Sequence, residues 1–187
     1  MVPRSELDAR LALLQQAIGE AGIDAALIMQ HADLFYFSGA VNRAILYVPA
    51  AGTPLLLTFP GAERIREETP LANIAELQRQ EQLPELLTRL GYALPKVSGL
   101  EADVLPLSVH SRLAAPFTGA RSVDVSGIIR KIRMIKSQWE IEQIAAACRM
   151  GLEIFDYVPQ VLCQPMNELE LAGQIERFSR QLGHPGY

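Results

Sequence analysis

The sequence predicts an α/β domain with a mixed sheet flanked by helices over residues 1–127, followed by a linker and two long helices over residues 128–187. In the first part, short apolar runs of strand length alternate with segments whose apolar residues recur at helical spacing. Two of these runs are separated only by residues 49–53, which suits an antiparallel hairpin. A capping signal at Ser137 then begins a helical segment of a different character.

The first helix is expected over residues 5–21. Ser5 can cap its start, and Gly22 suits the position that follows a helix end. Its apolar residues recur every three or four positions, as expected for a helix with one buried face: Leu7, Leu11, Leu14, Ile18 and Ala21.

The first strand is expected over residues 23–29, an apolar run that follows this helix directly. Residues 30–39 then form a loop with a short helix. The runs 44–48 and 54–59 predict two further strands, and the turn 49–53 joins them as a hairpin. Because a hairpin is antiparallel, the sheet is expected to be mixed.

The rest of this domain continues the alternation of helices and strands. Gly91 marks a helix end, and Pro106 suits a first helical position. Helices are expected at 61–68, 83–90 and 106–115, and strands at 74–77, 96–100 and 122–125.

Ser137 and Glu140 form a capping box, in which each side chain accepts a hydrogen bond from the other residue's backbone amide. The helix that follows is expected to run to about Leu162, with an apolar stripe over residues 141–158. Asn167 and Glu170 repeat the capping logic for a second helix, which carries a stripe over residues 171–182. These stripes need a partner surface, so we expect them to be partly uncovered in this chain and to drive association.

Composition narrows the classes of function. Hydrophobic residues make up 49% of the chain and the formal net charge is −4, which favours a globular protein and argues against nucleic-acid binding. The basic residues Arg130, Lys131, Arg133 and Lys136 are interpreted as a solvated approach to the helix. No apolar run approaches the ~20 residues of a membrane span, and no signal segment opens the chain, so a cytoplasmic protein without membrane contact is expected.

Motifs for nucleotide binding, zinc proteolysis or serine hydrolysis are absent from the sequence. The three histidines are far apart and have no ligand spacing. Residue pattern alone therefore indicates an α/β domain with a helical hairpin, and no catalytic residues or metal ligands.

Four segments resemble signatures of the creatinase/prolidase family. Residues 133–141, RMIKSQWEI, resemble the family pattern R-x-I-K-S-x-x-E-I, and residues 165–172, PMNELELA, resemble its second helix. There the family more often has Pro-Gly, and Asn167 takes the place of a Ser or Thr cap. Residues 22–28, GIDAALI, and 34–39, LFYFSG, resemble its G-I-D-A-x-L-I and N-L-x-Y-L-[ST]-G segments.

The resemblance implies a creatinase N-terminal domain, which is ribonuclease H-like, over residues 1–127. It implies that residues 128–187 open a truncated α+β domain of the pita-bread fold. In the family's peptidases that second domain binds two divalent metal ions, often manganese, cobalt or zinc, through two Asp, one His and two Glu. No such ligand is assigned in this chain, so the chain alone is expected to bind no catalytic metal and to be inactive.

The function that the resemblance implies is that of a metal-dependent Xaa-Pro peptidase, of aminopeptidase P or prolidase type, acting on proline-containing peptides. Two alternatives remain within the same fold. One is a creatinase-like amidinohydrolase, and the other is a non-catalytic binding or chaperone module.

The N-terminal domain of such a protein commonly supplies the contact of a homodimer and controls access to its partner's active site. By position, His31, Asp33, Tyr36 and Arg43 are candidates for substrate contact in trans. The alternative is an ordinary polar loop in which Asp33 caps the short helix and Tyr36 belongs to the core. His184 is a further candidate, and its alternative is a simple turn.

Overall fold

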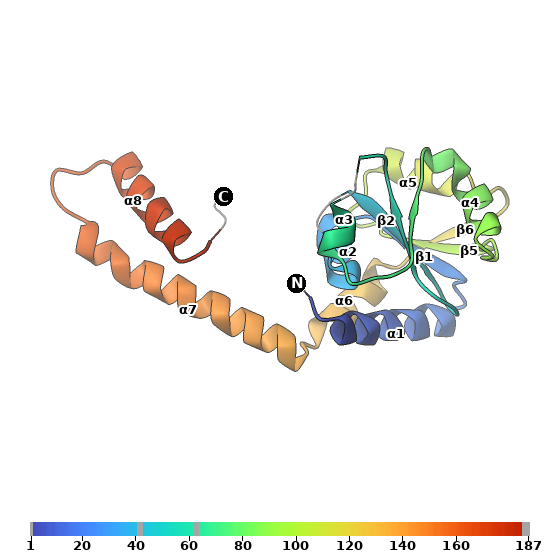
Figure 1. Cartoon of the computed structure of the whole chain (residues 1–187), viewed down its shortest axis with the longest axis horizontal. Coiled ribbons are helices and arrows are strands. Elements are labelled where there is room, and N and C mark those ends of the chain that lie inside the picture. Colours follow the sequence, from blue (N-terminus) through green and yellow to red (C-terminus); the bar gives the residue numbers. More distant parts are fainter. Residues whose placement is uncertain (1, 41–42, 62–63, 185–187) are drawn as a thin grey trace. The chain divides into compact units, whose positions relative to one another are not determined.

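A mixed sheet lies at the centre of the first of two compact units in a computed structural model that describes residues 2–40, 43–61 and 64–184 (Figure 1). Within the described residues the sheet has six strands in the order β4-β3-β2-β1-β5-β6. They are β1 (Ala25–Ile28), β2 (Ala44–Pro49), β3 (Leu55–Thr58), β4 (Ile74–Glu76), β5 (Val97–Leu100) and β6 (Arg121–Asp124). Strand β1 is antiparallel to β2 and parallel to β5, so the predicted mixed sheet is confirmed.

The predicted hairpin is formed by β2 and β3. Ala44 pairs with Thr58 and Tyr47 pairs with Leu55, which fixes the register across the turn. Gly52 in that turn has a φ of 110°, a conformation that residues with a side chain rarely adopt.

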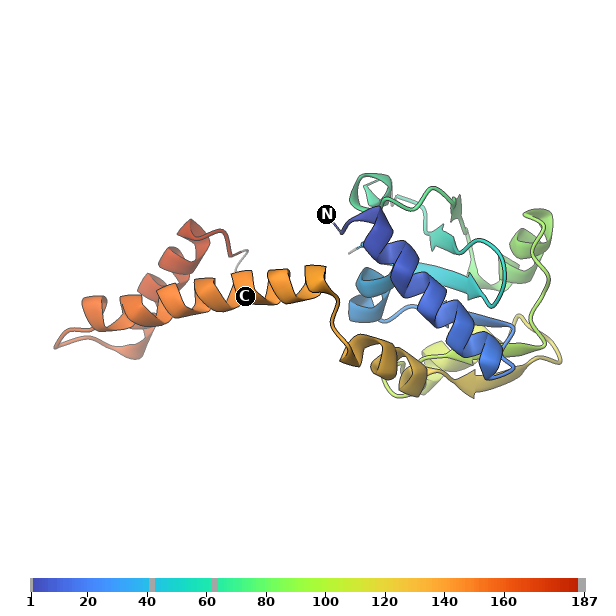
Figure 2. The ribbon, with the colours of Figure 1, turned by 90° about the horizontal axis from the view of Figure 1, so that it is seen from below.

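Helices cover both faces of the sheet. On one face α4 (Leu83–Arg89) and α5 (Leu107–Ala114) contribute to a core that includes Leu27, Tyr47 and Leu57. The other face carries α1 (Arg4–Glu20), α2 (His31–Ser38) and α6 (Ser126–Met134), and Figure 2 shows α1 and α6 side by side. Every position of β1 and β2 is therefore buried, which explains why these strands read as continuous apolar runs.

The predicted stripe of α1 is confirmed for Leu7, Leu11, Leu14 and Ile18, which are buried, but not for Ala21, which is exposed at the C-cap. The predicted cap is wrong. The helix starts at Arg4, with Pro3, two residues before Ser5, in the cap position and no side-chain cap. Ser5 lies inside the first turn and is exposed.

Helix α6 is the largest difference from the predicted elements. Residues 128–136 were predicted to be a solvated segment leading to the next helix. They instead belong largely to a helix of their own, at whose start the apolar side chains of Val125 and Ile129 are buried, and the basic residues follow them in the sequence. The helix packs against α1. The compact units accordingly divide between Ile135 and Lys136, whereas the predicted division lay at residue 127.

One predicted helix is shorter than expected. Among the described residues of the segment 61–68, the helical ones are those of α3 (Ile65–Glu68); residues 62–63 lie outside the described residues. A single turn of 3₁₀ helix, η1 (Gln80–Gln82), precedes α4.

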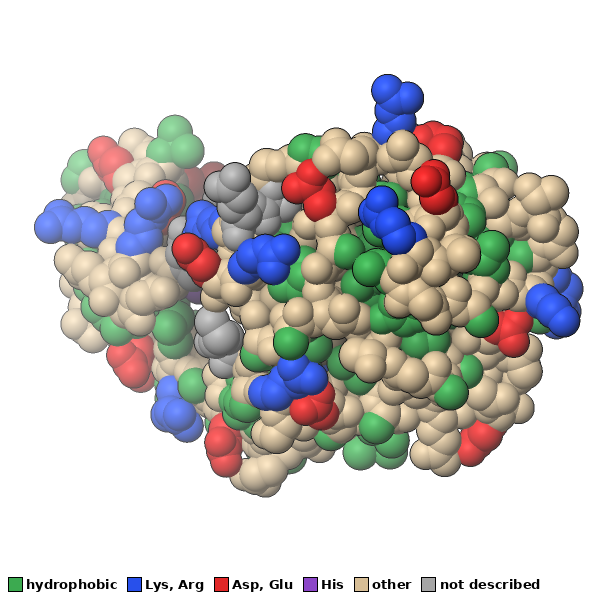
Figure 3. Space-filling view, turned by 45° about the vertical axis from the view of Figure 1, so that its right-hand side comes forward, with side chains coloured by type: hydrophobic (Ala, Val, Ile, Leu, Met, Phe, Trp, Pro, Cys, Tyr) green, Lys and Arg blue, Asp and Glu red, His purple; other side chains and the backbone are tan. Residues whose placement is uncertain are grey.

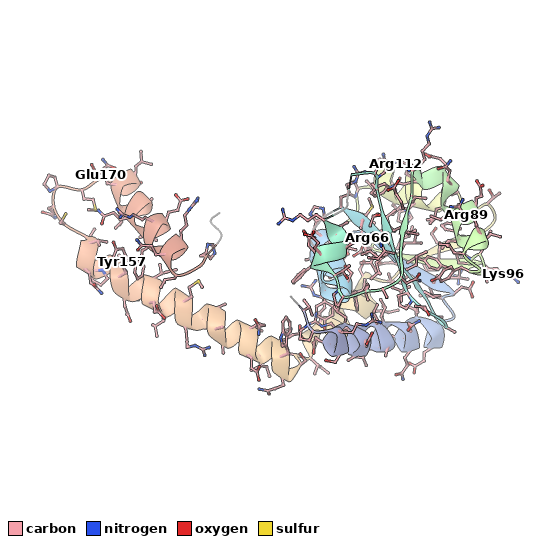
Figure 4. All side chains as sticks on the ribbon, in the orientation of Figure 1. Arg66, Arg89, Lys96, Arg112, Tyr157 and Glu170 are labelled. Atoms are coloured by element: carbon pink, nitrogen blue, oxygen red, sulfur yellow. The ribbon has the colours of Figure 1, made fainter. Side chains whose placement is uncertain are left out.

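The second unit contains α7 (Gln138–Val161) and α8 (Glu168–Gln181). Both predicted capping boxes are present: the amide of Glu140 donates to Ser137 Oγ over 3.1 Å, and that of Glu170 donates to Asn167 Oδ1 over 3.0 Å. The ring of Tyr157 on α7, labelled in Figure 4, stacks on that of Phe178 on α8 with centroids 4.1 Å apart and joins the two helices.

Much of the α7 stripe is uncovered within this unit, as expected. Ile141 is 49% exposed, Leu152 60% and Phe155 75%. No described helix is both long and apolar enough to span a membrane. On the face shown in Figure 3, acidic and basic side chains are interspersed among polar and apolar ones.

The capping box at Ser137 makes a testable contrast with Ser5. Ser137→Ala removes the acceptor for the Glu140 amide and is expected to destabilise α7 by about 1 kcal/mol. Ser5→Ala, at an exposed position that caps nothing, is expected to change stability by less than about 0.5 kcal/mol. Urea unfolding followed by far-ultraviolet circular dichroism measures both, and equal losses in the two variants would contradict this assignment.

Candidate functional site

Strands β1 and β5 end side by side, and polar side chains gather at that edge of the sheet. The strands are parallel, with Leu27 opposite Leu100, so Glu101 emerges beside the chain that leaves β1. Its Oε2 accepts hydrogen bonds from the backbone amides of Met29 at 2.7 Å and Gln30 at 3.0 Å. The carboxyl ends of parallel strands are where α/β proteins commonly place ligand contacts.

Helix α2 begins directly at this edge. Gln30 occupies the cap position, and its Oε1 accepts the backbone amide of Asp33 at 2.9 Å. The alternative that Asp33 caps this helix is therefore wrong, since the cap acceptor is the side chain three residues earlier. The Asp33 carboxylate instead forms an ion pair with Arg133 of α6.

Tyr36 lies one turn further along α2, and two guanidinium groups lie near its ring. The group of Arg10 is 4.0 Å from the ring centroid, and that of Arg133 is 5.6 Å from it. Arg10 also donates to the Tyr36 carbonyl over 2.8 Å and forms an ion pair with Glu6 at 2.9 Å. We refer to Glu6, Arg10, Asp33, Tyr36, Glu101 and Arg133 as the α2 cluster.

Burial separates the members of the α2 cluster that solvent can reach from those that it cannot. Glu101 is fully buried, and Asp33 and Tyr36 are each 8% exposed. The Arg133 side chain, by contrast, is 42% exposed. Burial, followed by the neighbouring Asp33, raises the pKa of Glu101 to about 7, although the amides of Gln30 and Met29 act in the opposite direction.

The five predicted site residues do not all belong to the α2 cluster. Asp33 and Tyr36 meet in the α2 cluster, and Tyr36 is buried as the core interpretation required; His31 is exposed at the first position of α2. Arg43 is exposed before β2, with its guanidinium 5.0 Å from the ring centroid of Phe59. His184 belongs to the second unit, where its amide donates to the Ser179 carbonyl over 3.0 Å. The assignment of these residues to substrate contact stays a prediction.

Sequence reasoning missed Glu101, Arg133 and Arg10. Glu101 directly follows a predicted strand, so the strand-end rule that selected the His31 segment would also have selected it. Arg133 stood in a basic cluster interpreted as solvated. The Arg130 side chain is 65% exposed, as that interpretation requires, and pairs with Asp103, whereas Arg133 is only 42% exposed and pairs with Asp33. Arg10 has a local signal in its i,i+4 spacing from Glu6, but its contact with α2 could not be predicted, since Tyr36 is 26 positions away.

The α2 cluster offers an anion-binding chemistry more readily than a metal site. Its solvent-reachable group is a guanidinium, which matches the geometry of a carboxylate. Among the described residues, no three His, Cys, Asp or Glu side chains gather closely enough to hold a metal ion. The family's pair of metal ions therefore does not fit the residues that the structure describes, and the chemistry of the α2 cluster is that of its guanidinium and carboxyl groups.

A cavity of about 720 Å³ lies at the opposite edge of the sheet, where β1 and β5 begin. Its polar groups hold loops together: the hydroxyl of Tyr92 donates to Thr53, and the carboxylate of Asp24 accepts the amides of Lys96 and Val97. Burial raises the pKa of Tyr47 in its wall to about 12, with smaller effects from Tyr92 and Asp24. These groups are engaged in structural bonds, so we assign the cavity no catalytic role.

The fold and the α2 edge define an α/β domain with a helical extension, and comparison with known proteins identifies the family. Residues 10–135 match the family described as Creatinase/Prolidase N-terminal domain. The chain therefore belongs to the creatinase/prolidase family, as the sequence motifs predicted.

Similar proteins include peptidases of archaea and bacteria. The Xaa-Pro dipeptidase of Pyrococcus horikoshii is 25% identical over 86% of this chain and 44% of its own length. The X-Pro aminopeptidase of Thermotoga maritima is 28% identical with a TM-score of 0.79, covering 92% of this chain and 49% of that one. The Xaa-Pro dipeptidase of Bacillus anthracis has a TM-score of 0.81 at 20% identity, covering 94% of this chain and 49% of that one. At this identity the similarity shows the fold alone. The chain spans about half the length of the curated relatives it matches.

Proposed function

We propose that this chain is the N-terminal portion of a metal-dependent Xaa-Pro peptidase, of aminopeptidase P or prolidase type. The observation that carries the proposal is the 28% identity to an X-Pro aminopeptidase over 92% of the chain. That coverage exceeds the family domain at residues 10–135, so the similarity includes residues of the second unit. A match confined to the α/β domain would have supported the family without favouring a peptidase.

The proposed role of the first unit is to control access to the active site of a partner subunit. His31 is exposed at the start of α2 and is the most accessible of the candidates on that helix. Asp33 and Tyr36 are buried, so we expect them to act on a substrate only through Arg133, which they contact. A guanidinium in this position suits the carboxylate of a short peptide.

The intact protein is proposed to bind two divalent metal ions, with manganese, cobalt and zinc as the candidates. Such a pair supplies a hydroxide near neutral pH and stabilises an oxyanion. The ligands would belong to residues other than those that the structure describes. In this proposal the first unit contributes shape and charge around the substrate.

The intact protein is also proposed to act as a homodimer or a higher homo-oligomer. The uncovered apolar side chains of α7, such as Phe155, support self-association of the 187-residue chain. Sedimentation equilibrium at increasing concentration measures the association. A monomer at every concentration would contradict this part of the proposal.

One assay tests the proposed activity. The intact protein is incubated with an Xaa-Pro dipeptide and with longer Xaa-Pro peptides, with and without added manganese, and release of the N-terminal residue is measured. We expect metal-stimulated release. No release from any of these peptides would overturn the peptidase proposal, hydrolysis of a guanidino substrate without metal would favour the amidinohydrolase, and binding without turnover would favour a non-catalytic module.

A further inference from the structure

Glu101 is a buried acid with one unsatisfied oxygen. Its exposure is 0%, and its Oε2 accepts the two amides of Met29 and Gln30. Among the groups that the structure describes, its Oε1 has no hydrogen-bond partner. A buried polar atom without a partner loses its hydration and gains nothing in return, so native proteins rarely leave one.

A second acid, Asp33 of α2, lies beside Glu101. Gln30 links the two residues, because its backbone amide donates to Glu101 Oε2 and its Oε1 accepts the Asp33 amide, and the charge of Asp33 raises the pKa of Glu101. Two neighbouring ionised carboxylates repel each other and offer only acceptors, so an ionised Glu101 would be both unpaired and repelled. A single proton between the two acids removes both problems, because a protonated carboxyl group can donate.

Charges on the surrounding elements indicate which acid holds that proton. Asp33 pairs with Arg133 on α6, which favours its ionised form, and Arg10 and Glu6 on α1 pair with each other. Asp124 on β6 accepts from Ser126 and Ala102, and Arg130 on α6 pairs with Asp103. Within the part of the chain that the structure describes, none of these cations pairs with Glu101, so Glu101 is the acid left without a counter-charge.

We propose that Glu101 is protonated on Oε1 at neutral pH and donates that proton in a hydrogen bond to the Asp33 carboxylate. Glu101 then satisfies both of its oxygens, and Asp33 remains charged for Arg133. The side chain becomes a positioning residue that fixes Met29, Gln30 and Asp33, which together set where α2 begins. Any effect of this protonation on substrate contact rests on the proposed role of α2 in the intact peptidase. The protonation itself does not depend on that role.

The direction of the Glu101 pKa agrees with this geometry. Burial raises it from 4.5 to about 7, and the neighbouring Asp33 adds to the increase. A folded-state pKa above the unfolded value means that the folded protein binds the proton more tightly. The resulting stability is complete below about pH 4.5 and is lost as the pH rises through about 7.

A carboxyl-carbon NMR titration of the whole chain tests the protonation directly. The protein is labelled with ¹³C at glutamate carboxyl groups, and the Glu101 signal is assigned as the one absent from Glu101→Gln. We expect a titration midpoint near 7. A midpoint near the ordinary value of 4.5 would overturn the proposal.

The same variant gives a second, independent measurement. Glutamine reproduces a protonated glutamate, because its carbonyl can accept from Met29 and Gln30 while its amide donates to Asp33. As the pH is raised from about 5 to about 8, the urea concentration at the unfolding midpoint is expected to decrease more for the wild type than for Glu101→Gln. Glu85→Gln, at an exposed position of α4, is the control and should retain the wild-type pH dependence.

Glu101→Gln that is less stable than the wild type at pH 8, or that fails to fold, would show that the ionised carboxylate is required and would overturn the proposal. Asp33→Asn removes the neighbouring charge and should move the Glu101 midpoint to lower pH. These measurements do not involve peptide hydrolysis. A failure of the peptidase proposal would therefore leave them unchanged, and their failure would leave the peptidase assay unaffected.

Discussion

Arg10→Ala is expected to destabilise the first unit by about 3–5 kcal/mol, the largest effect of any single charged residue in the α2 cluster. The Arg10 side chain is 5% exposed, and its partner Glu6 is 13% exposed. Removing the guanidinium leaves the Glu6 carboxylate buried without this counter-charge and removes the donor to the Tyr36 carbonyl. Loss of the contact with the Tyr36 ring adds to the cost.

The same helix supplies a matched control for Arg10. Arg4 and Asp8 are also four residues apart, but their side chains are 48% and 54% exposed. Asp8→Ala breaks that pair while keeping the hydrogen bond from Arg4 to Pro70, and it should cost less than about 1 kcal/mol. Urea unfolding at pH 7 measures both variants. Similar losses for the two would show that burial does not set the strength of the Arg10 pair.

Features encoded by neighbouring residues were predictable from the sequence. The stripe of α1, the hairpin of β2 and β3 and both capping boxes each depend on residues within one helix turn or one tight turn. Hydrophobic periodicity and cap chemistry report such local arrangements directly. These elements, with the family motifs, were enough to predict a mixed sheet flanked by helices.

Features that depend on distant partners were not predictable in the same way. Helix α6 was missed although Ile128, Ile129 and Ile132 recur at helical spacing, because its basic residues were interpreted as a solvated approach and its packing against α1 cannot be seen within the segment. Arg133 and Asp33 are 100 positions apart, and Glu101 is 71 positions from Gln30. A pattern within one segment cannot report that a strand end, a helix start and a second helix meet at one edge.

The candidate site was therefore predicted in part. Position after a strand directed attention to the start of α2, but it selected His31 and Asp33 without the residues that contact them. The structure changes the interpretation of Asp33 from a cap to one end of an ion pair, with a buried acid beside it. The chemistry of that edge depends on Asp33, Glu101 and Arg133 together.

Gly99→Ala is expected to destabilise the first unit by about 1–3 kcal/mol, although alanine is otherwise a mild substitution. Gly99 is buried in β5, between Ala26 of β1 and Val123 of β6. A Cβ atom there would overlap Val125 Cγ1 and would also come within 3.4 Å of Ile23 Cγ2. Val125 is fully buried and β-branched, so it has few rotamers with which to make room.

Two further variants test whether the steric overlap, and not the replacement of a glycine as such, causes the loss of stability. Gly127→Ala places a methyl group on α6 where, apart from its chain neighbours and its own helix backbone, the structure describes no atom within 4 Å, and it should leave stability unchanged or raise it by about 0.5–1 kcal/mol. Val125→Ala removes Cγ1, so Gly99→Ala combined with Val125→Ala should cost less than the sum of the two single changes. Additive losses in that double-mutant cycle, measured by urea unfolding, would mean that Val125 does not limit the space at Gly99.

The close approach of β5 to Val125 also sets where α6 begins, since the amides of Ile128 and Ile129 both donate to the Val125 carbonyl. A displaced Val125 would therefore move the helix that carries Arg133, so the Arg133–Asp33 pair should weaken in Gly99→Ala and recover in the double variant.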